Sequence, residues 1–164
     1  MPDLLTHALA AYSLGMVCSW RVEWLDTPYV TAMMVGAFVP DLVKVKLLVP
    51  SAEIGATLGI PFSWLPLHTL TGVLLSVLLL AGLVADPRTR RQVLLTSGGG
   101  ALSHLMLDAL LRTPTGRGGP VFWPITEYQP PTPGLYLSTE PWPTALFLGV
   151  AVLVVVADRR LSAS

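Results

Sequence analysis

The sequence predicts an all-α integral membrane protein, a helical bundle of about five helices. Apolar residues make up 52% of its 164 residues and charged residues only 12%, and the mean hydropathy is +0.64. Soluble domains usually carry about 25% charged residues. The apolar residues also form long blocks, and a membrane-spanning helix needs about 20 mostly apolar residues. We therefore expect a single transmembrane helical domain over residues 1–164.

Five apolar blocks define the expected helices. They cover approximately residues 4–20, 29–49, 66–85, 92–111 and 143–157. Pro40 lies inside the second block, and because proline has no amide hydrogen it leaves the carbonyl of Gly36 without its helical donor. We therefore expect a broken second helix, which a membrane protein tolerates where the break lines a cavity or is packed in protein.

Two longer connections separate these blocks. Residues 50–65 contain several glycines and prolines, and we expect a re-entrant or interfacial loop there. Residues 113–142 are rich in proline, glycine and aromatic residues, so we expect a loop before the last helix whose aromatic side chains lie at the headgroup level.

The basic residues predict an orientation in the cell membrane. If all five blocks span, one side carries Arg21, Arg88, Arg90, Arg91, Arg159 and Arg160, and the other carries Arg112 and Arg117, with Lys44 and Lys46 closer to that second side. Arginine in short loops favours the cytoplasmic side. We therefore expect the N-terminus outside and the C-terminus in the cytoplasm. The N-terminus lacks a basic region and a clear cleavage site, so we expect no cleaved signal peptide.

Charge and cysteine content exclude several functions. The net charge is zero, so no basic surface indicates nucleic acid as a partner. Cys18 is the only cysteine, which excludes an internal disulfide and a thiolate metal cluster. Gly98-Gly99-Gly100 lacks the lysine and hydroxyl residue of a phosphate loop. Small residues in an apolar block instead favour close helix packing.

Five ionisable residues in the apolar blocks are the candidate site. They are His7, Asp41, His68, His104 and Asp108, and the expected topology places all five at the same, outer end of the bundle. Ionisable groups in membrane segments are costly, and they tend to face the bundle interior and carry function. Their shared end favours one polar site over scattered structural residues.

The spacing of His104 and Asp108 places both on one helix face. An imidazole and a carboxylate at this spacing can bind one divalent cation, and nitrogen with oxygen ligands suits zinc, manganese or iron. The pair alone is better explained by a hydrogen bond that satisfies two buried polar groups.

The other candidates also have structural interpretations. Asp41 follows the helix break and could cap a helix and pair with Lys44 one turn later. His68 and His7 could be interfacial histidines at helix starts. Lys44 and Lys46 are expected to extend toward the headgroups, although Lys44 or Arg112 could bind a phosphate or carboxylate of a ligand.

The motifs resemble, in order and spacing, a known family. They are Thr6-His7, Gly36 through Pro40-Asp41, His68-Thr69, Ser103-His104 with Asp108, and Phe122-Trp123-Pro124. Together they resemble the LexA-binding, inner-membrane-associated metal-dependent hydrolase family, a distant relative of zinc-dependent phospholipase C. The resemblance covers residues 6 to about 124.

The resemblance implies a metal site of His7, Asp41, His68, His104 and Asp108, with Trp123-Pro124 in a loop beside it. Two positions depart from the family pattern. Val43 replaces a second aspartate, and Ser63-Trp64 replaces a histidine-arginine pair. The departures imply fewer ligands than a two-metal site requires, so a single-metal site or a degenerate, non-catalytic copy both remain consistent with the resemblance.

The sequence therefore supports three functions. The first is a membrane-bound hydrolase that uses a divalent metal, zinc before manganese or iron, and a metal-activated water on a phosphoester or lipid-linked substrate, with Asp41 or Asp108 as catalytic base. The second is a non-catalytic scaffold or partner-binding protein in which the cluster is a hydrogen-bond network. The third is an ion transporter, favoured by the broken second segment but opposed by a site at one end of the bundle.

Overall fold

A computed structural model describes residues 4–161, and over that range the chain forms helices and connecting segments without a β-strand. The predicted all-α class is therefore confirmed for the described residues. Six α-helices and two 3₁₀ helices follow one another as α1 (Leu4–Ser19), α2 (Thr27–Gly36), η1 (Pro40–Leu47), α3 (Ser51–Leu58), η2 (Leu65–His68), α4 (Leu70–Gly82), α5 (Pro87–Asp108) and α6 (Trp142–Leu161).

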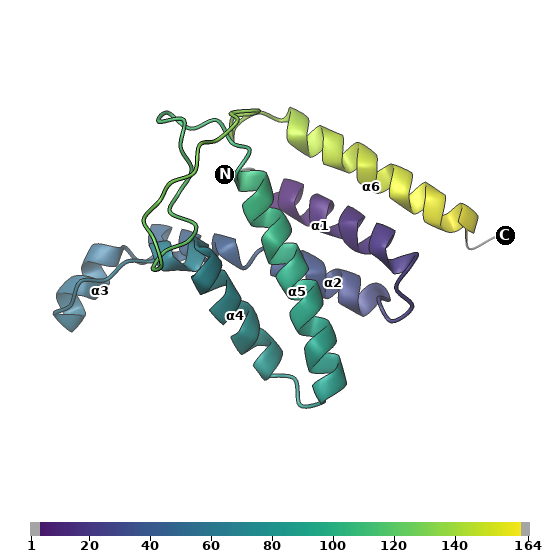
Figure 1. Ribbon diagram of the computed structural model, residues 1–164, viewed down its shortest axis with the longest axis horizontal. Coiled ribbons are helices and arrows are strands. Elements are labelled where there is room, and N and C mark those ends of the chain that lie inside the picture. The colour runs from purple at the N-terminus through teal and green to yellow at the C-terminus, as the bar shows by residue number, and fades with distance from the viewer. Residues whose placement is uncertain (1–3, 162–164) are drawn as a thin grey trace.

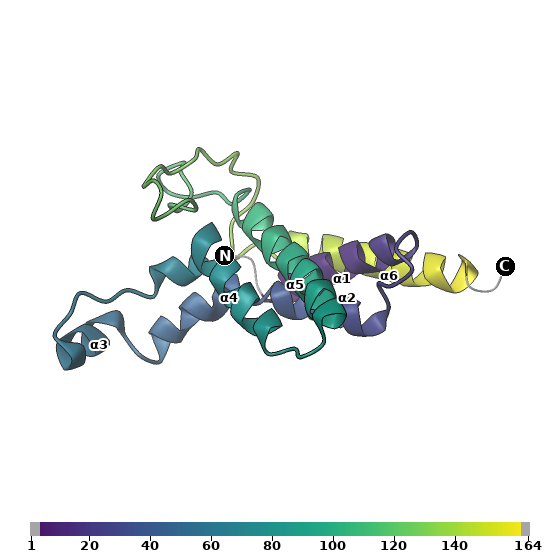
Figure 2. The same cartoon turned by 60° about the horizontal axis from the view of Figure 1, so that its bottom comes forward.

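Neighbouring helices of the bundle run in both relative directions, since α2 is parallel to α5 and α6 is parallel to α1. α1 packs against α2 and α6, and α5 packs against α2, α4 and α1. Figure 1 shows α4 and α5 side by side, with α6 running along α1. α3 has no buried residue and stands apart from the other helices in both Figure 1 and Figure 2. Consequently, the N-terminal end of α1, the C-terminal ends of α2 and α5, and the start of α4 lie at one end of the bundle.

The sequence predicts five membrane-spanning segments, but among residues 4–161 no helix is both long enough and apolar enough to cross a bilayer.

The first, fourth and fifth apolar blocks correspond closely to α1, α5 and α6, whereas the second block is divided. α2 ends at Gly36, and the chain continues from Pro40 as the 3₁₀ helix η1. Since Pro40 cannot donate to the carbonyl of Gly36, that carbonyl instead accepts from the amide of Val39 at 3.0 Å. The predicted break at Pro40 is therefore confirmed, and it produces a tighter helix rather than a second α-helical half.

Two other expectations need correction. The third block does not form one helix over 66–85, because α4 begins only at Leu70 and ends at Gly82. Thr69 sets that start, as its extended backbone and its hydroxyl, which accepts from the amide of Gly72 at 3.2 Å, form an N-cap. Within 50–65, the expected loop contains the short helix α3, which ends at Leu58 and is followed by Gly59 with a φ of 67°.

The backbones of α2 and α5 touch at two glycines. A Cβ added at Gly36 would collide with the backbone of Ser97, and one added at Gly100 would collide with the backbone of Met33. Only glycine allows this close approach. The expectation of close packing in the 98–100 run is thus confirmed at Gly100, and it brings the last turns of α5 against the chain that follows α2.

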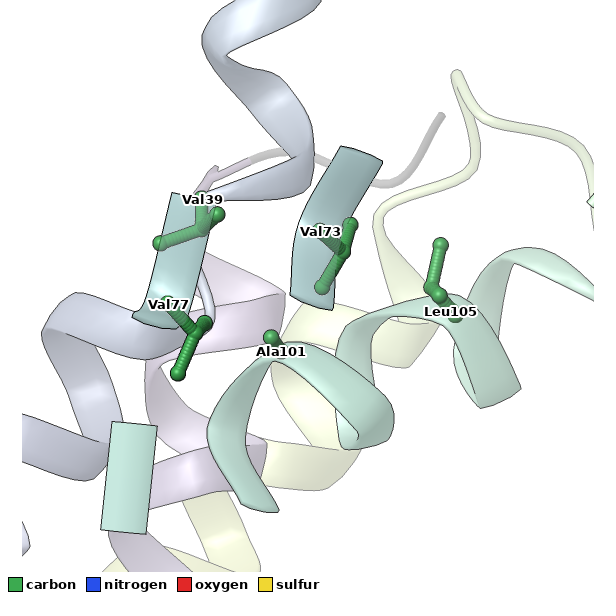
Figure 3. Packing of buried hydrophobic residues seen from close by; sticks show 5 residues of the cluster. All are labelled: Val39, Val73, Val77, Ala101 and Leu105. Atoms are coloured by element: carbon green, nitrogen blue, oxygen red, sulfur yellow. The ribbon is translucent and has the colours of Figure 1, made fainter. Parts of the chain in front are cut away.

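The principal apolar cluster lies beside this contact. It contains Val39, Val73, Val77, Ala101 and Leu105, all less than a tenth exposed. Figure 3 shows these side chains converging from the segment after α2, from α4 and from α5. Val39 and Leu105 directly neighbour Pro40 and His104 in the sequence, so this core supports the elements that carry the polar residues.

Candidate metal centre

The five predicted site residues come together at one end of the bundle. His7 lies in the first turn of α1, Asp41 at the start of η1 and His68 at the end of η2, while His104 and Asp108 occupy the last turns of α5. Asp108 is the common neighbour of the three histidines. Its carboxylate oxygens lie 3.5 Å from Nε2 of His7, 2.9 Å from Nε2 of His68 and 3.3 Å from Nε2 of His104.

The ring of His104 is oriented by the backbone. Its side chain is fully buried, and Nδ1 lies 2.7 Å from the carbonyl oxygen of Ala37. A carbonyl oxygen only accepts, so Nδ1 carries the hydrogen and donates it. In the neutral ring, Nε2 therefore presents a lone pair toward Asp108 and toward Oδ1 of Asp41, 4.0 Å away.

His68 repeats this arrangement from another element. Its Nδ1 donates to the carbonyl of Pro40 at 3.0 Å, which directs Nε2 toward Oδ2 of Asp108. The break in the second segment thus supplies both a carboxylate, from Asp41, and the carbonyl that orients a histidine. Backbone carbonyls that bind the outer nitrogen are the usual device for fixing a metal-binding imidazole.

The resulting electrostatics require a positive charge at the centre. If the rings of His68 and His104 are neutral, each directs the lone pair of Nε2 at the carboxylate of Asp108. Nitrogen acceptors would then face oxygen acceptors across about 3 Å. Either added protons or a cation removes this repulsion. Oδ1 of Asp41, Oδ1 of Asp108 and Nε2 of His104 are buried without a hydrogen-bond partner, which is costly unless a cation binds them.

His7 favours a metal ion over protons. It is fully buried, and neither of its ring nitrogens has a hydrogen-bond partner. Its ring stacks on that of His104, with centroids 3.6 Å apart and planes inclined by 11°. Two stacked imidazolium rings would repel each other strongly in a buried site, whereas one divalent ion can bind both neutral rings.

The donor set fits a divalent metal ion. The ligand atoms of His7, His104 and Asp108 lie within 4.8 Å of one another, as do those of Asp41, His68 and His104. Donors that share one ion at about 2.1 Å are at most about 4.2 Å apart, so small side-chain movements suffice. Three nitrogens and carboxylate oxygens form the kind of set that zinc, manganese and iron accept.

Asp41 has one oxygen available for such an ion. Its Oδ2 pairs with Nζ of Lys44 at 2.7 Å, while its Oδ1 faces His104 without a partner. The expected pairing of Asp41 with Lys44 is therefore present, together with the contact to the cluster.

The two departures from the family pattern have structural roles here. Val43 is buried in the fold and brings no ligand. The hydroxyl of Ser63 accepts from the amide of Leu65, and the indole of Trp64 donates to the carbonyl of Val49. Of the positions that differ, none contributes to the polar cluster.

A cavity of about 110 Å³ opens beside the cluster and was not predicted from the sequence. His68, Asp108 and Leu105 form one wall, and loop residues 118–121 and 130–132 form the other. The hydroxyl oxygen of Thr132 is buried and has no hydrogen-bond partner. Trp123, expected beside the site, is more than a third exposed and does not line this cavity.

Tyr136 links the loop before α6 to the candidate site through a hydrogen bond. Its hydroxyl donates to the carbonyl of Leu107 at 2.7 Å, one residue before Asp108. Burial and the negative charge of Asp108 raise the pKa of Tyr136 to about 12, so the phenol stays protonated and remains a donor. Arg112, considered above as a phosphate ligand, is exposed and donates instead to the carbonyl of Gly134.

Fold and site together define a class of protein, an all-helical bundle with a buried histidine-aspartate cluster suited to a divalent cation at one end. A comparison with family models gives a match over nearly the whole chain. Residues 1–163 match the model of the family described as YdjM inner membrane protein, and the chain belongs to this family. Comparison with curated proteins and with solved structures gave no match. The family description supports membrane association and specifies neither LexA binding nor hydrolysis.

Proposed function

We propose that this protein is a membrane-bound, metal-dependent hydrolase that acts on a phosphoester or lipid-linked substrate. The observation that carries the proposal is the set of buried, unpartnered nitrogen and oxygen atoms that converge from α1, η1 and α5, with His68 of η2 beside them. A structural network would satisfy these atoms with hydrogen bonds, whereas here they have no hydrogen-bond partner.

His7, His68, His104, Asp41 and Asp108 would hold the ion, with zinc as the first choice and manganese or iron as alternatives. A bound divalent ion lowers the pKa of a coordinated water toward about 7 and polarises a phosphoryl or acyl oxygen. We assign the general base to one of the two aspartates. Asp108 lines the cavity, whereas Asp41 is buried beneath Lys44, so Asp108 is better placed to accept a proton from the attacking water.

The reaction is an ordinary hydrolysis. The water oxygen forms a bond to phosphorus or to the acyl carbon, and the bond from that atom to the leaving oxygen breaks. One water proton passes to the base and then to the leaving oxygen, so the products are an alcohol and a phosphate or carboxylic acid.

Metal analysis tests the proposal. We expect the purified parent to contain a divalent metal and His104→Ala and Asp108→Ala to lose most of it, because each removes a ligand shared by the cluster. Leu102→Ala, an exposed position on the same helix, is the matched control and should keep the parent's content. Equal metal in all four proteins, or none in the parent, contradicts the proposal. A screen of phosphoesters and lipids then identifies the substrate.

The arginine distribution motivates a proposed orientation in which the N-terminus and the site face outward and the C-terminus is cytoplasmic. A cysteine introduced at the exposed Arg117, in a Cys18→Ser background, should react with a membrane-impermeant maleimide in intact cells. Labelling only after cell lysis reverses the orientation.

A specific observation supports a second candidate, a non-catalytic scaffold with a degenerate site. Val43 and Ser63-Trp64, where the resembling family carries ligands, serve packing and local hydrogen bonds in this chain. If the parent binds no metal and the triple replacement of His7, His68 and His104 by alanine leaves folding intact, the scaffold is favoured.

A further inference from the structure

An apolar groove runs between α4 and α5 and reaches the candidate metal centre. Its volume is about 270 Å³, and leucine, valine and glycine alone form its walls. Leu70 and Val73 lie at its α4 wall, and Gly98 and Leu102 at its α5 wall. A site without any polar group selects for an apolar ligand.

Leu105 connects this groove to the cavity beside the metal centre. Its side chain lines both spaces, and it follows His104 directly in α5. On the other helix, Thr69 lines the cavity and the next residue, Leu70, lines the groove. In Figure 3, Leu105 lies at one end of the apolar cluster formed with Val73 and Val77. A ligand in the groove therefore points toward His68 and Asp108.

The far side of the cavity contains one unsatisfied polar group. The buried hydroxyl of Thr132 has no partner within the described residues, and a buried hydroxyl without a partner is costly. A ligand atom that hydrogen-bonds to this hydroxyl would remove that cost. The order in space is thus the polar cavity, the candidate metal ligands and the apolar groove. An amphiphile has the same order, with a polar head at one end and an apolar chain at the other.

The continuity of the groove with the polar cavity favours an amphiphilic chain as the occupant. Because Leu105 lines both spaces, one molecule can place an apolar part in the groove and a polar part in the cavity. An acyl chain is narrow, wholly apolar and flexible enough to follow the space beside Leu105.

We propose that the substrate is a lipid whose acyl chain lies in the groove between α4 and α5, with Leu105 contacting the chain where the groove meets the cavity and Thr132 binding a polar atom near the scissile group. This inference rests on the proposed hydrolase function, and it assigns its substrate class and two specificity-determining residues. The groove is open at the protein surface, so the chain can enter sideways from a bilayer.

Photocrosslinking with a defined lipid tests the proposal. The probe is lysophosphatidic acid with a diazirine at the end of its acyl chain, added to the purified full-length protein in a maltoside detergent. Crosslinked residues are then identified by mass spectrometry, with and without added zinc. We expect crosslinks at groove residues such as Leu74, Leu78 and Leu102 in both conditions. An even distribution over exposed leucines outside the groove, such as Leu75, Leu79 and Leu153, overturns the proposal.

Gly98→Leu is the blocking variant, and the structure provides its control. A Cβ added at Gly98 meets nothing within 4 Å, so the larger side chain can enter the groove without disturbing the fold. Gly149 in α6 has equally open surroundings, and Gly149→Leu adds the same side chain to a different helix. We expect Gly98→Leu to weaken binding of the probe about tenfold, the change that follows when about two methylene groups leave an apolar site. Gly149→Leu should bind like the parent.

Thr132→Val removes the hydroxyl while preserving the shape of the side chain. We expect roughly fivefold weaker binding of the probe with the crosslinks still in the groove, because one hydrogen bond is lost and the chain keeps its place. Unchanged binding overturns the role of Thr132.

The outcomes separate this inference from the proposed function. Unchanged binding in Gly98→Leu, with zinc content equal to that of the parent, overturns the groove and leaves the metal-dependent function standing. A change of oligomeric state in Gly98→Leu, measured by light scattering, assigns the groove to a second copy and also overturns the proposal. Absence of any divalent metal from the parent itself overturns the proposed function.

Discussion

At the scale of single residues, the imidazoles of the candidate centre use their two nitrogens differently. The outer nitrogens of His68 and His104 donate to backbone carbonyls, and the inner nitrogens face the carboxylate of Asp108. Both rings are therefore held in the orientation that binds a cation before any cation arrives. Such preorganisation reduces the cost of binding, since the ligands need little rearrangement.

Lys44 is the existing cation at this site, and its removal is informative. In Lys44→Met, Oδ2 of the buried Asp41 loses its partner at 2.7 Å. Because the lysine side chain is about one third exposed, we expect the metal-free protein to lose only about 1 kcal/mol of stability. Zinc affinity should rise, since Asp41 then lacks a competing cation.

Denaturant titrations with and without zinc measure both effects. Lys46→Met, on the same 3₁₀ helix but without a hydrogen bond to Asp41, serves as the control. A lower zinc affinity in Lys44→Met would show that Lys44 supports the metal site instead of competing with it.

At the scale of secondary-structure elements, the contact between α2 and α5 positions the centre. Gly36 and Gly100 let the two backbones touch, and the next turn of α5 then places His104 against the carbonyl of Ala37. The side chains at the end of α5 depend on this approach, because moving α5 outward by the width of a methyl group would break that 2.7 Å hydrogen bond.

Two substitutions in the same glycine run test this dependence. Gly100→Ala should destabilise the protein by about 2 kcal/mol or more and reduce metal binding, because its Cβ collides with the backbone of Met33. Gly98→Ala, where a Cβ meets nothing, should be neutral or stabilise by up to about 1 kcal/mol, since alanine is the better helix former. Thermal unfolding and zinc titration of both variants provide the comparison. Equal effects of the two substitutions would contradict the close contact.

Some secondary-structure elements could be predicted from the sequence and others could not. Long apolar blocks predicted α1, α5 and α6 closely, and Pro40 predicted the break of the second block. Helix α3 was not predicted, because this short stretch contains Gly55, is followed by Gly59 and Pro61, and buries no residue. The late start of α4 depends on the cap at Thr69, a local hydrogen bond that apolar content does not reveal.

At the scale of the whole molecule, a metal ion would connect elements that are distant in the sequence. The candidate ligands come from α1, η1, η2 and α5, so a bound ion would link most of the bundle at one end. Binding to the folded state alone stabilises a protein in proportion to the logarithm of the free ligand concentration.

Addition and removal of metal should therefore change the unfolding temperature. At a zinc concentration about 1,000 times the dissociation constant we expect about 4 kcal/mol of stabilisation, which corresponds to roughly 10 °C for a chain of this size. A chelator should reverse the increase. His104→Ala should show little response to either treatment, because both ligand triads contain His104. An equal increase in parent and variant would place the zinc outside this centre.

The sequence by itself determined the all-α class, the break at Pro40, and the five candidate residues that the fold brings together at a shared end of the bundle. These properties follow from the long apolar blocks, from the missing amide of proline, and from the alternating direction of successive helices.

Only the tertiary structure decided how the site is held. The carbonyls that orient the histidines lie 67 residues from His104 and 28 residues from His68, and no local pattern connects such pairs. The same holds for the buried hydroxyl of Thr132 and for the groove that meets the cavity at Leu105. The sequence specifies the chemistry of each side chain, whereas the distances between side chains are set when separate elements pack together.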